Sequence, residues 1–317
     1  GSVAPCRWAS HSGNNKGSPA PCLRSARPSR PPIVLPMKLQ LLSDIHFESS
    51  PDFVPEPAPD ADLLVLAGDI GSYQRGSALT ARGVPDFGLA PFARRADGTG
   101  WPVPVIYVPG NHEYDALDFD DTHARLRETA ERLGLIWLER ETRVLDGVRF
   151  IGTTLWTDFD ALAPRGPTAS LTAQLTAREK AFRAANHYLR MAATTRAGLP
   201  FLAEEMREQA LVCQDWLRAA LATPYADGPT VAITHFAPSL RSHDPRYGLT
   251  PGTAGFCNAL DELLPQADLW LHGHLHCALD YRAGRCRVVA NPLGYASKGE
   301  QAAFQPTWAL PVERGPA

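Results

Sequence analysis

A carboxylate and an imidazole placed two residues apart are the first side chains in the sequence that could do chemistry. Asp44 and His46 follow a short segment in which Leu39, Leu41 and Leu42 are apolar. Side chains two apart on an extended segment project from the same face, so both can bind one cation. Alone the pair is weak evidence, because Asp-x-His occurs by chance. The remaining ligands must come from elsewhere in the chain.

Other metal-capable side chains follow further apolar segments that we expect to be strands. The segments are 62–67, 103–108, 230–234 and 268–271, and the side chains that follow them are Asp69, Asn111, His235 and His274. Ligand sites in layered α/β sheets form beyond the carboxyl ends of the strands. This mixture of imidazole, carboxylate and amide groups suits Zn, Mn, Fe or Co better than Ca or purely oxygen-bound Mg.

The ordered motifs resemble the calcineurin-like metallophosphoesterase family. They run from Met37 to about Tyr295 and comprise Asp44-x-His46, Gly68-Asp69, Gly110-Asn111-His112-Glu113, His235 and Gly273-His274-x-His276. The resemblance implies an α/β fold, a four-layer α/β/β/α sandwich of two mixed sheets packed face to face with helices outside. It also implies two divalent metal ions as cofactors, with Mn, Fe and Zn as the alternatives for their identity.

The resemblance also implies a role for each matching residue. The first ion would take Asp44, His46 and His276, the second would take Asn111, His235 and His274, and Asp69 would bridge them. A hydroxide held between the ions would attack phosphorus. Asn111 and His112 would contact the phosphate, and His112 would protonate the leaving oxygen. His243, in the loop after His235, is either a third substrate contact or a surface residue.

One departure from the family patterns narrows the predicted activity. Protein Ser/Thr phosphatases of this superfamily continue Gly-Asp as Gly-Asp-x-Val-Asp-Arg-Gly, whereas this chain reads Gly68-Asp69-Ile70-Gly71-Ser72-Tyr73. The arginine that would bind a phosphoprotein is not at its expected position. The chain looks more like bacterial stand-alone members, many of which cleave phosphodiesters, and we predict a phosphodiesterase. The alternatives are a broad-specificity phosphomonoesterase and a non-catalytic metal-binding scaffold; the presence of His112 argues against the scaffold.

Several polar and aromatic residues outside the motifs have alternative interpretations. We expect His272 to lie in the core or beside the ligands, and His123 and His187, on helical segments, to be solvated. Glu113 is expected to orient neighbouring histidine or backbone groups. Four more residues could either line or support the site or simply pack: Trp156, Asp158, Asn291 and Tyr295.

Composition limits the class of protein. The formal net charge of −3 argues against a general nucleic-acid-binding surface, although metal ions can supply the positive charge that a small phosphoester needs. No apolar run approaches the roughly 18 residues that span a bilayer. The cysteines show no C-x-x-C spacing, which favours a reducing, cytoplasmic location; they are Cys6, Cys22, Cys213, Cys257, Cys277 and Cys286.

Two segments stand apart from the alternation of strands and helices. Residues 1–36 are rich in Pro, Ser, Gly and Arg and contain no Asp or Glu, so we expect a disordered tail. We interpret this tail as a translated upstream region or a remnant of expression, and we expect the folded domain over residues 37–317. Residues 168–222 are mostly helix formers, and we expect an insertion of two or three helices. We also expect strands at 136–138 and 148–152, separated by a hairpin turn at Asp146-Gly147, and a strand at 287–290. Further helices are expected over Thr122–Leu133 and Phe256–Leu264.

Overall fold

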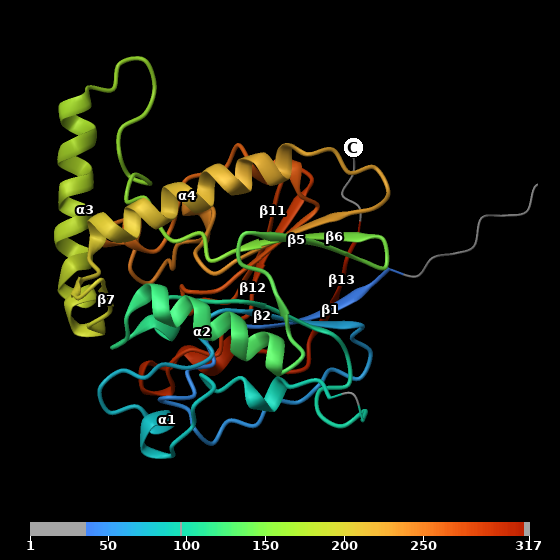
Figure 1. Cartoon of the computed structure of the whole chain (residues 1–317). Coiled ribbons are helices and arrows are strands. Elements are labelled where there is room, and N and C mark those ends of the chain that lie inside the picture. Colours follow the sequence, from blue (N-terminus) through green and yellow to red (C-terminus); the bar gives the residue numbers. More distant parts are fainter. Residues whose placement is uncertain (1–35, 96, 314–317) are drawn as a thin grey trace, which may run out of the picture. The chain divides into compact units, whose positions relative to one another are not determined.

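Two mixed β-sheets form the framework of the chain (Figure 1). The computed structural model describes residues 36–95 and 97–313; the predicted tail, apart from Pro36, lies outside these residues. The first sheet has the strand order β13-β1-β2-β3-β4 and the second has the order β11-β12-β10-β9-β6-β5. The first contains β1 (Lys38–Leu42), β2 (Leu63–Ala67), β3 (Val105–Val108), β4 (Ile136–Trp137) and β13 (Ala309–Pro311). The second contains β5 (Glu141–Leu145), β6 (Val148–Thr153), β9 (Thr230–Thr234), β10 (Leu269–His272), β11 (Leu279–Ala283) and β12 (Cys286–Ala290).

The inner strands of both sheets are parallel, which brings their carboxyl ends to one edge of each sheet. β1, β2, β3 and β4 run parallel to one another, with β13 antiparallel at the edge. In the second sheet β6, β9, β10 and β12 are parallel, with β5 and β11 antiparallel at the edges. The loops that carry the candidate ligands therefore leave neighbouring strands at the same edge.

The alternation of side chains along the strands separates two apolar layers. In β2, Leu63 and Val65 belong to a buried cluster shared with Val231 of β9, so this cluster lies between the two sheets. Leu64 and Leu66 point to the opposite face, into a cluster that also contains residues of the helices. The two sheets thus pack face to face and carry helices outside, and the predicted four-layer sandwich is confirmed.

Two helices cover the outer faces of the sheets. α2 (Phe119–Arg132) contributes Leu126 to the outer cluster, and α4 (Ala203–Ala222) contributes Cys213 and Leu217. α2 begins three residues before the predicted helix because the Asp118 side chain caps it, accepting the N–H groups of residues 120 and 121.

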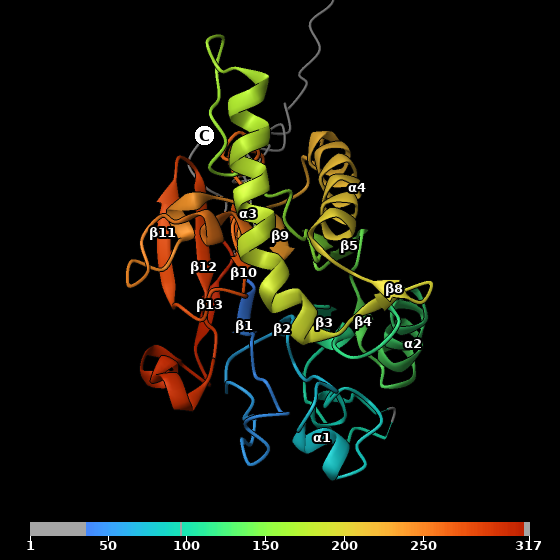
Figure 2. The same ribbon diagram turned by 90° about the vertical axis from the view of Figure 1, so that its left-hand side faces the viewer.

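The segment over residues 168–222 contains two long helices. α3 (Leu171–Ala192) is joined to α4 by a small hairpin of β7 (Thr195–Arg196) and β8 (Leu199–Pro200). Of the α3 side chains, only Ala181 is buried, so this helix is largely exposed. Figures 1 and 2 show α3 standing beyond the ends of the sheet strands, whereas α4 lies along the second sheet.

The remaining elements are short. α1 spans Ala78–Ala81. Single turns of 3₁₀ helix occur at Ala90–Phe92, His112–Tyr114, Leu240–Ser242, Pro251–Gly255, Leu264–Gln266, Ala296–Lys298 and Glu300–Ala303. None of the helices in the described residues is long and apolar enough to cross a membrane. The four cysteines among these residues, Cys213, Cys257, Cys277 and Cys286, are free thiols.

Two expectations about secondary structure are wrong. The segment Phe256–Leu264 is not a helix, because the N–H groups of Asn258 and Leu260 bond to the carbonyls of residues 237 and 238 instead of to preceding turns. The hairpin turn at Asp146-Gly147 is present, but the strand that it joins to β6 is β5. The segment predicted as its neighbour, β4, pairs with β3 in the other sheet.

Candidate metal centre

The strand-end loops bring the predicted ligands into two groups that share Asp69. The first group consists of Asp44, His46, Asp69 and His276, and the second contains Asp69, His235 and His274. Within each group, one ligand atom from every residue lies within 4.8 Å of the others. The shared carboxylate is in the position that the resemblance assigns to the bridging ligand.

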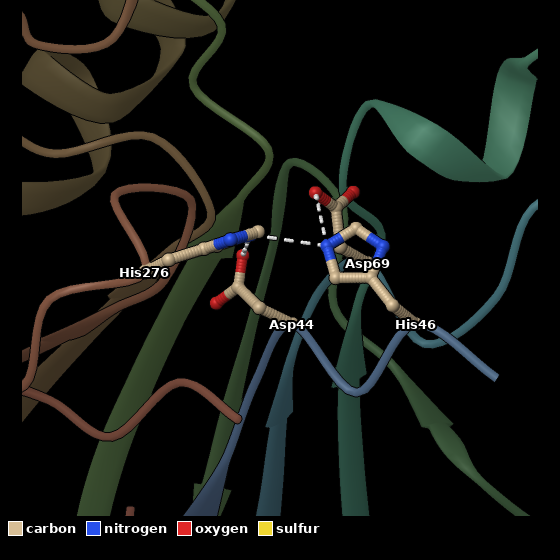
Figure 3. A group of neighbouring side chains, drawn as sticks. All are labelled: Asp44, His46, Asp69 and His276. Atoms are coloured by element: carbon tan, nitrogen blue, oxygen red, sulfur yellow. Dashed lines mark hydrogen bonds and ion pairs between the residues drawn. The ribbon is translucent and has the colours of Figure 1, made fainter. Parts of the chain in front are cut away.

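The ligand atoms of the first group converge on one point (Figure 3). The Nε2 atoms of His46 and His276 lie 3.0 Å apart. His276 Nε2 is 3.4 Å from Asp44 Oδ1, and His46 Nε2 is 3.9 Å from Asp69 Oδ2. Two imidazole nitrogens and two carboxylates that face one another are the donor set of a divalent transition metal.

The second group is completed by an amide. His235 Nε2 lies 3.1 Å from Asp69 Oδ2 and 3.1 Å from Asn111 Oδ1. The rings of His235 and His274 have centroids 5.0 Å apart. All seven residues predicted as ligands therefore lie together, and their role as ligands stays a prediction.

Several buried ligand atoms lack a hydrogen-bond partner among the described residues. One oxygen of each aspartate accepts a backbone N–H, Asp44 Oδ1 from His274 and Asp69 Oδ1 from His112, both at 2.8 Å. The other oxygens, Asp44 Oδ2 and Asp69 Oδ2, have no hydrogen bond, and neither does His274 Nε2, although Asp69 Oδ2 lies at ion-pair distance from His235. Unsatisfied buried polar atoms are costly, and a bound cation would satisfy all three. The residues fit the metal ions that the resemblance implies.

Hydrogen bonds to the outer ring nitrogens orient three of the histidines. His46 Nδ1 lies 2.7 Å from Glu48 Oε1, and His276 Nδ1 lies 2.6 Å from Glu300 Oε2. His235 Nδ1 is 2.8 Å from the carbonyl oxygen of Ala67. Partners of this kind fix the ring orientation and leave Nε2 to bind metal. The sequence reasoning missed both glutamates: Glu48 could have been found from its spacing to His46, whereas Glu300 has no such signal.

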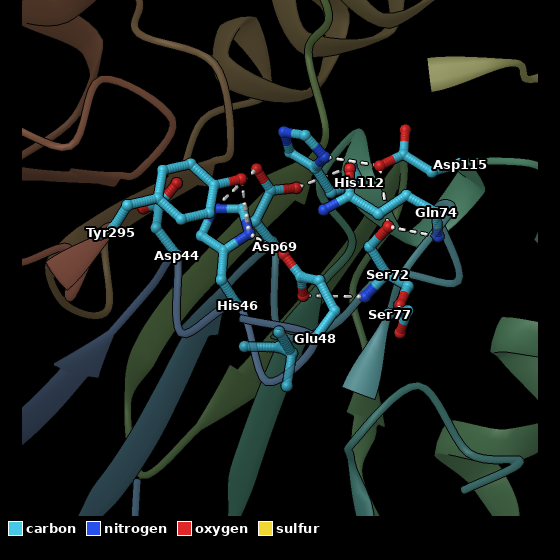
Figure 4. A network of polar contacts seen from close by, with 12 residues as sticks. Asp44, His46, Glu48, Asp69, Ser72, Gln74, Ser77, His112, Asp115 and Tyr295 are labelled. Atoms are coloured by element: carbon cyan, nitrogen blue, oxygen red, sulfur yellow. Dashed lines mark hydrogen bonds and ion pairs between the residues drawn. The ribbon is translucent and has the colours of Figure 1, made fainter. Parts of the chain in front are cut away.

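His112 is held beside the shared carboxylate by a network of polar contacts (Figure 4). Its Nδ1 lies 2.6 Å from Asp115 Oδ2, an oxygen that also accepts the Ser72 hydroxyl at 2.8 Å. Its ring centroid is 4.9 Å from that of His46, and 26% of its side chain is exposed. Burial alone would lower the pKa of His112, but Asp115 and Asp69 outweigh it and raise the pKa well above the ordinary value. A protonated His112 can donate a proton to a bound phosphoester.

The charges within the two groups compensate one another. Burial alone would raise the pKa of Asp44, but its contacts with His276 lower it to about 2. Burial would lower the pKa of His276, but Asp44 and Glu300 raise it to about 9. Burial would lower the pKa of His235, but Asp69 raises it to about 9 as well. Metal binding must displace protons from these imidazoles, so metal affinity rises with pH.

The backbone at the ligands is held in an unusual conformation. Asp44, His46, Asp69, His274 and His276 have φ angles between 47° and 71°, in the left-handed region that non-glycine residues seldom adopt. Such residues cost about 1–3 kcal/mol each and persist where the surrounding structure enforces them, typically at functional sites.

Glu113 and two glycines explain how the loops pack so closely. Glu113 accepts the backbone N–H groups of Asp69, Ile70 and Gly110 at 2.9–3.2 Å, which agrees with its predicted orienting role. A Cβ atom at Gly110 would lie 2.1 Å from Asp69 Oδ1, and one at Gly273 would lie 2.5 Å from Asp44 Oδ2. The glycines of the motifs are therefore required by the position of the carboxylates.

The expectations for the histidines outside the two groups are only partly confirmed. His272 is buried in β10 and His187 is exposed, as expected. The expectation for His123 is wrong, because its ring packs against Phe119 and Trp137, and burial lowers its pKa to about 4. His243 contacts the carbonyl oxygen of Leu240, and its role in substrate binding stays a prediction.

Of the four residues that could either line or support the site or simply pack, two lie at or support the site and two only pack. Tyr295 touches the site, with its ring centroid 4.4 Å from His46, and Asn291 supports the first strand by donating to the carbonyl of Leu41. Trp156 is buried in an aromatic cluster, and Asp158 accepts a hydrogen bond from the Gln214 side chain, so both are packing residues.

Comparisons with known proteins agree with this geometry. The chain matches the model of the calcineurin-like phosphoesterase family over residues 37–278. It is 24% identical over 286 residues to the uncharacterized protein L509 of Acanthamoeba polyphaga mimivirus, covering 81% of this chain and 91% of that protein.

A solved structure shows the same fold. A phosphopantetheinyl hydrolase from Mycobacterium tuberculosis superimposes with a TM-score of 0.58 at 20% identity, covering 89% of this chain and 98% of that one. A dimetal phosphatase from Danio rerio gives a TM-score of 0.46 at 14% identity, covering 86% and 90%. The strand-end ligands, the sandwich and the match over most of the chain together show that this protein belongs to the calcineurin-like phosphoesterase family.

Proposed function

We propose that the protein is a phosphodiesterase that uses two divalent metal ions, with Mn, Fe and Zn as the alternatives. The observation that carries the proposal is the pair of ligand groups that share Asp69, with buried ligand atoms left unsatisfied beside His112. We further propose that its substrate is a small phosphoester and that it acts in the cytoplasm.

The metal ions would supply the chemistry that side chains lack, namely a hydroxide nucleophile at neutral pH and neutralisation of the charge on the phosphoryl oxygens. Asp44, His46 and His276 would hold one ion, and His235, His274 and Asn111 the other, with Asp69 between them.

The chain's own residues complete the reaction. His112 donates a proton to the leaving oxygen, and Asp115 holds its ring in place through Nδ1. Glu48 and Glu300 contact the Nδ1 atoms of His46 and His276, which leaves the Nε2 atoms of both rings free for the ion that they would hold.

The residue at the position of the phosphatase arginine supports a diester substrate. Tyr73 occupies that position, and its hydroxyl donates to the carbonyl of Val84 at 2.9 Å, so it is engaged with its own loop. A phosphomonoester carries up to two negative charges and a diester carries one, so a site without that arginine is better suited to the diester.

The test is hydrolysis of bis-p-nitrophenyl phosphate and of p-nitrophenyl phosphate by the manganese-loaded protein. Faster turnover of the diester is expected, and faster turnover of the monoester would favour the phosphomonoesterase. No turnover of either by protein that holds two ions would favour the scaffold. Because the Mycobacterium protein is named a phosphopantetheinyl hydrolase, a phosphopantetheinyl ester belongs in the wider substrate panel.

A further inference from the structure

α3 is fixed close to both sides of the metal centre. At its carboxyl end, the carbonyl of Ala192 accepts the N–H of Ala116, in the loop that carries His112. Further back along the helix, a Cβ at Gly255 would lie 3.7 Å from the Cβ of Ala185. Figure 2 shows the helix crossing in front of the strand ends. The second half of α3 therefore lies between the His112 loop and the segment that precedes Phe256.

Phe256 extends an apolar surface from that segment to the metal centre. Its ring centroid is 5.1 Å from that of His274, and 42% of the residue is exposed. An exposed aromatic ring beside a candidate metal-binding residue can pack against the organic group of a phosphoester.

An apolar groove begins at the end of this segment that lies away from Phe256. It has a volume of about 400 Å³ and lies between α3 and the chain around Pro251. Its walls are mostly small or apolar, with Ala173 and Ala177 on the helix and Leu162 and Leu249 opposite. Among the described residues that line it, Lys180 alone is charged. The groove suits an uncharged chain.

Exposed apolar side chains continue the groove face of α3 toward the carboxyl end of the helix. Ala177, Tyr188 and Met191 lie at positions i, i+11 and i+14, which repeat on one helical face. Tyr188 is 66% exposed and Met191 is 70% exposed. At 1.5 Å per residue the face from Ala177 to Met191 is about 21 Å long. Together with the groove, these exposed side chains provide an apolar surface that the organic chain of a substrate can contact.

From this arrangement we infer that α3 and the segment 249–256 form a subsite for the organic part of the substrate. The inference rests on the proposed function. The substrate is a phosphoester that carries an uncharged, extended and largely apolar chain. The phosphate lies at the metal centre, the first part of the chain on Phe256 and Tyr188, and the remainder in the groove.

The test compares two chromogenic diesters that share one leaving group, p-nitrophenyl methyl phosphate and p-nitrophenyl tetradecyl phosphate, whose chain is long enough to reach the groove, both used below the micelle concentration. Burial of the additional methylene groups should lower KM by about tenfold or more for the tetradecyl ester, with little change in kcat. Equal KM values for the two esters would overturn the subsite while leaving the phosphodiesterase intact.

Two substitutions locate the subsite. Ala177→Trp fills the groove and Tyr188→Ser removes part of the exposed face, so each should raise KM for the tetradecyl ester and leave KM for the methyl ester unchanged. Leu175→Ser is the matched control, because Leu175 is exposed on α3 and lies on the side opposite Ala177. An equal effect of all three variants, or no effect of the first two, would refute the assignment.

A binding measurement separates failure of the subsite from failure of the proposed function. If neither ester is cleaved, calorimetric titration with methylphosphonate and tetradecylphosphonate still reports on the subsite. Tighter binding of tetradecylphosphonate, with a more negative heat-capacity change that Ala177→Trp abolishes, supports the subsite. Equal binding of the two phosphonates contradicts it.

Discussion

Replacing Glu300 with glutamine should weaken metal binding at the first group of ligands and spare the second. Glu300 Oε2 accepts from His276 Nδ1 at 2.6 Å and from the Tyr295 N–H at 2.9 Å, and its side chain is only 4% exposed. Glutamine has nearly the same shape and can still accept from Tyr295, but it removes the negative charge behind the imidazole. A hydrogen bond to a charged acceptor is about twice as strong as a neutral one.

The expected magnitude follows from the position of Glu300 behind a ligand. Loss of a carboxylate that orients a metal-binding histidine costs about 10–100-fold in metal affinity, equivalent to about 1.4–2.7 kcal/mol. The second group should be spared because its orienting contact is different: His235 Nδ1 faces the backbone carbonyl of Ala67, which the substitution leaves in place.

Competition with a chelator of known affinity for manganese measures the two sites separately. The wild type should hold two ions over a range of chelator in which Glu300→Gln holds one. Glu262→Gln is the matched control, because Glu262 pairs with Arg218 on the exposed surface. Two ions bound with unchanged affinity by the Glu300 variant would refute the reasoning, and so would equal weakening of both sites.

Three further substitutions test other parts of the structure. His112→Asn should keep both ions and lower kcat by about 10²–10⁴-fold, measured by metal analysis and steady-state kinetics on the same sample; unchanged kcat would remove His112 from the mechanism. Gly273→Ala places a Cβ 2.5 Å from Asp44 Oδ2, so elemental analysis should find the first ion lost, and full occupancy would contradict the packing argument. Burial raises the pKa of the Glu139 carboxyl, so the folded protein keeps a proton that the unfolded chain releases. The free energy of unfolding therefore falls as the pH rises above the pKa of this carboxyl in the unfolded chain, about 4.3. In urea denaturation, Glu139→Gln should lose less stability than the wild type between about pH 5 and about pH 8, and parallel losses would show that the carboxyl is not responsible.

The residues that make up the two candidate ligand groups could be located from the sequence because each depends on a local relation that the fold preserves. Asp44 and Asp69 follow adjacent parallel strands of the first sheet, and His235 and His274 follow adjacent parallel strands of the second. Parallel order brings each pair to one edge of its own sheet, and the packing of the two sheets then brings the two edges together. Their recognition required short motifs and strand ends, not a three-dimensional arrangement.

The residues that support the ligands could not be predicted in the same way. Glu300 lies 24 positions after His276 in a single turn of 3₁₀ helix, where no periodicity marks it. The edge strands β11 and β13 were missed because they are short or alternate charged with half-buried residues. Asn258 shows the opposite error: its segment has a helical composition, but tertiary hydrogen bonds to residues 156 and 237 hold it extended.

The ligands come from both sheets, which has a consequence for the lifetime of the protein in a cell. Asp44 and Asp69 follow strands of the first sheet, and His235 and His274 follow strands of the second. Bound ions would therefore join the two halves of the sandwich, across as many as 230 positions of sequence between His46 and His276. A ligand present at 100 times its dissociation constant stabilises the folded state by about 2.7 kcal/mol. Proteases act on transiently opened chains, so metal starvation should shorten the half-life of this protein.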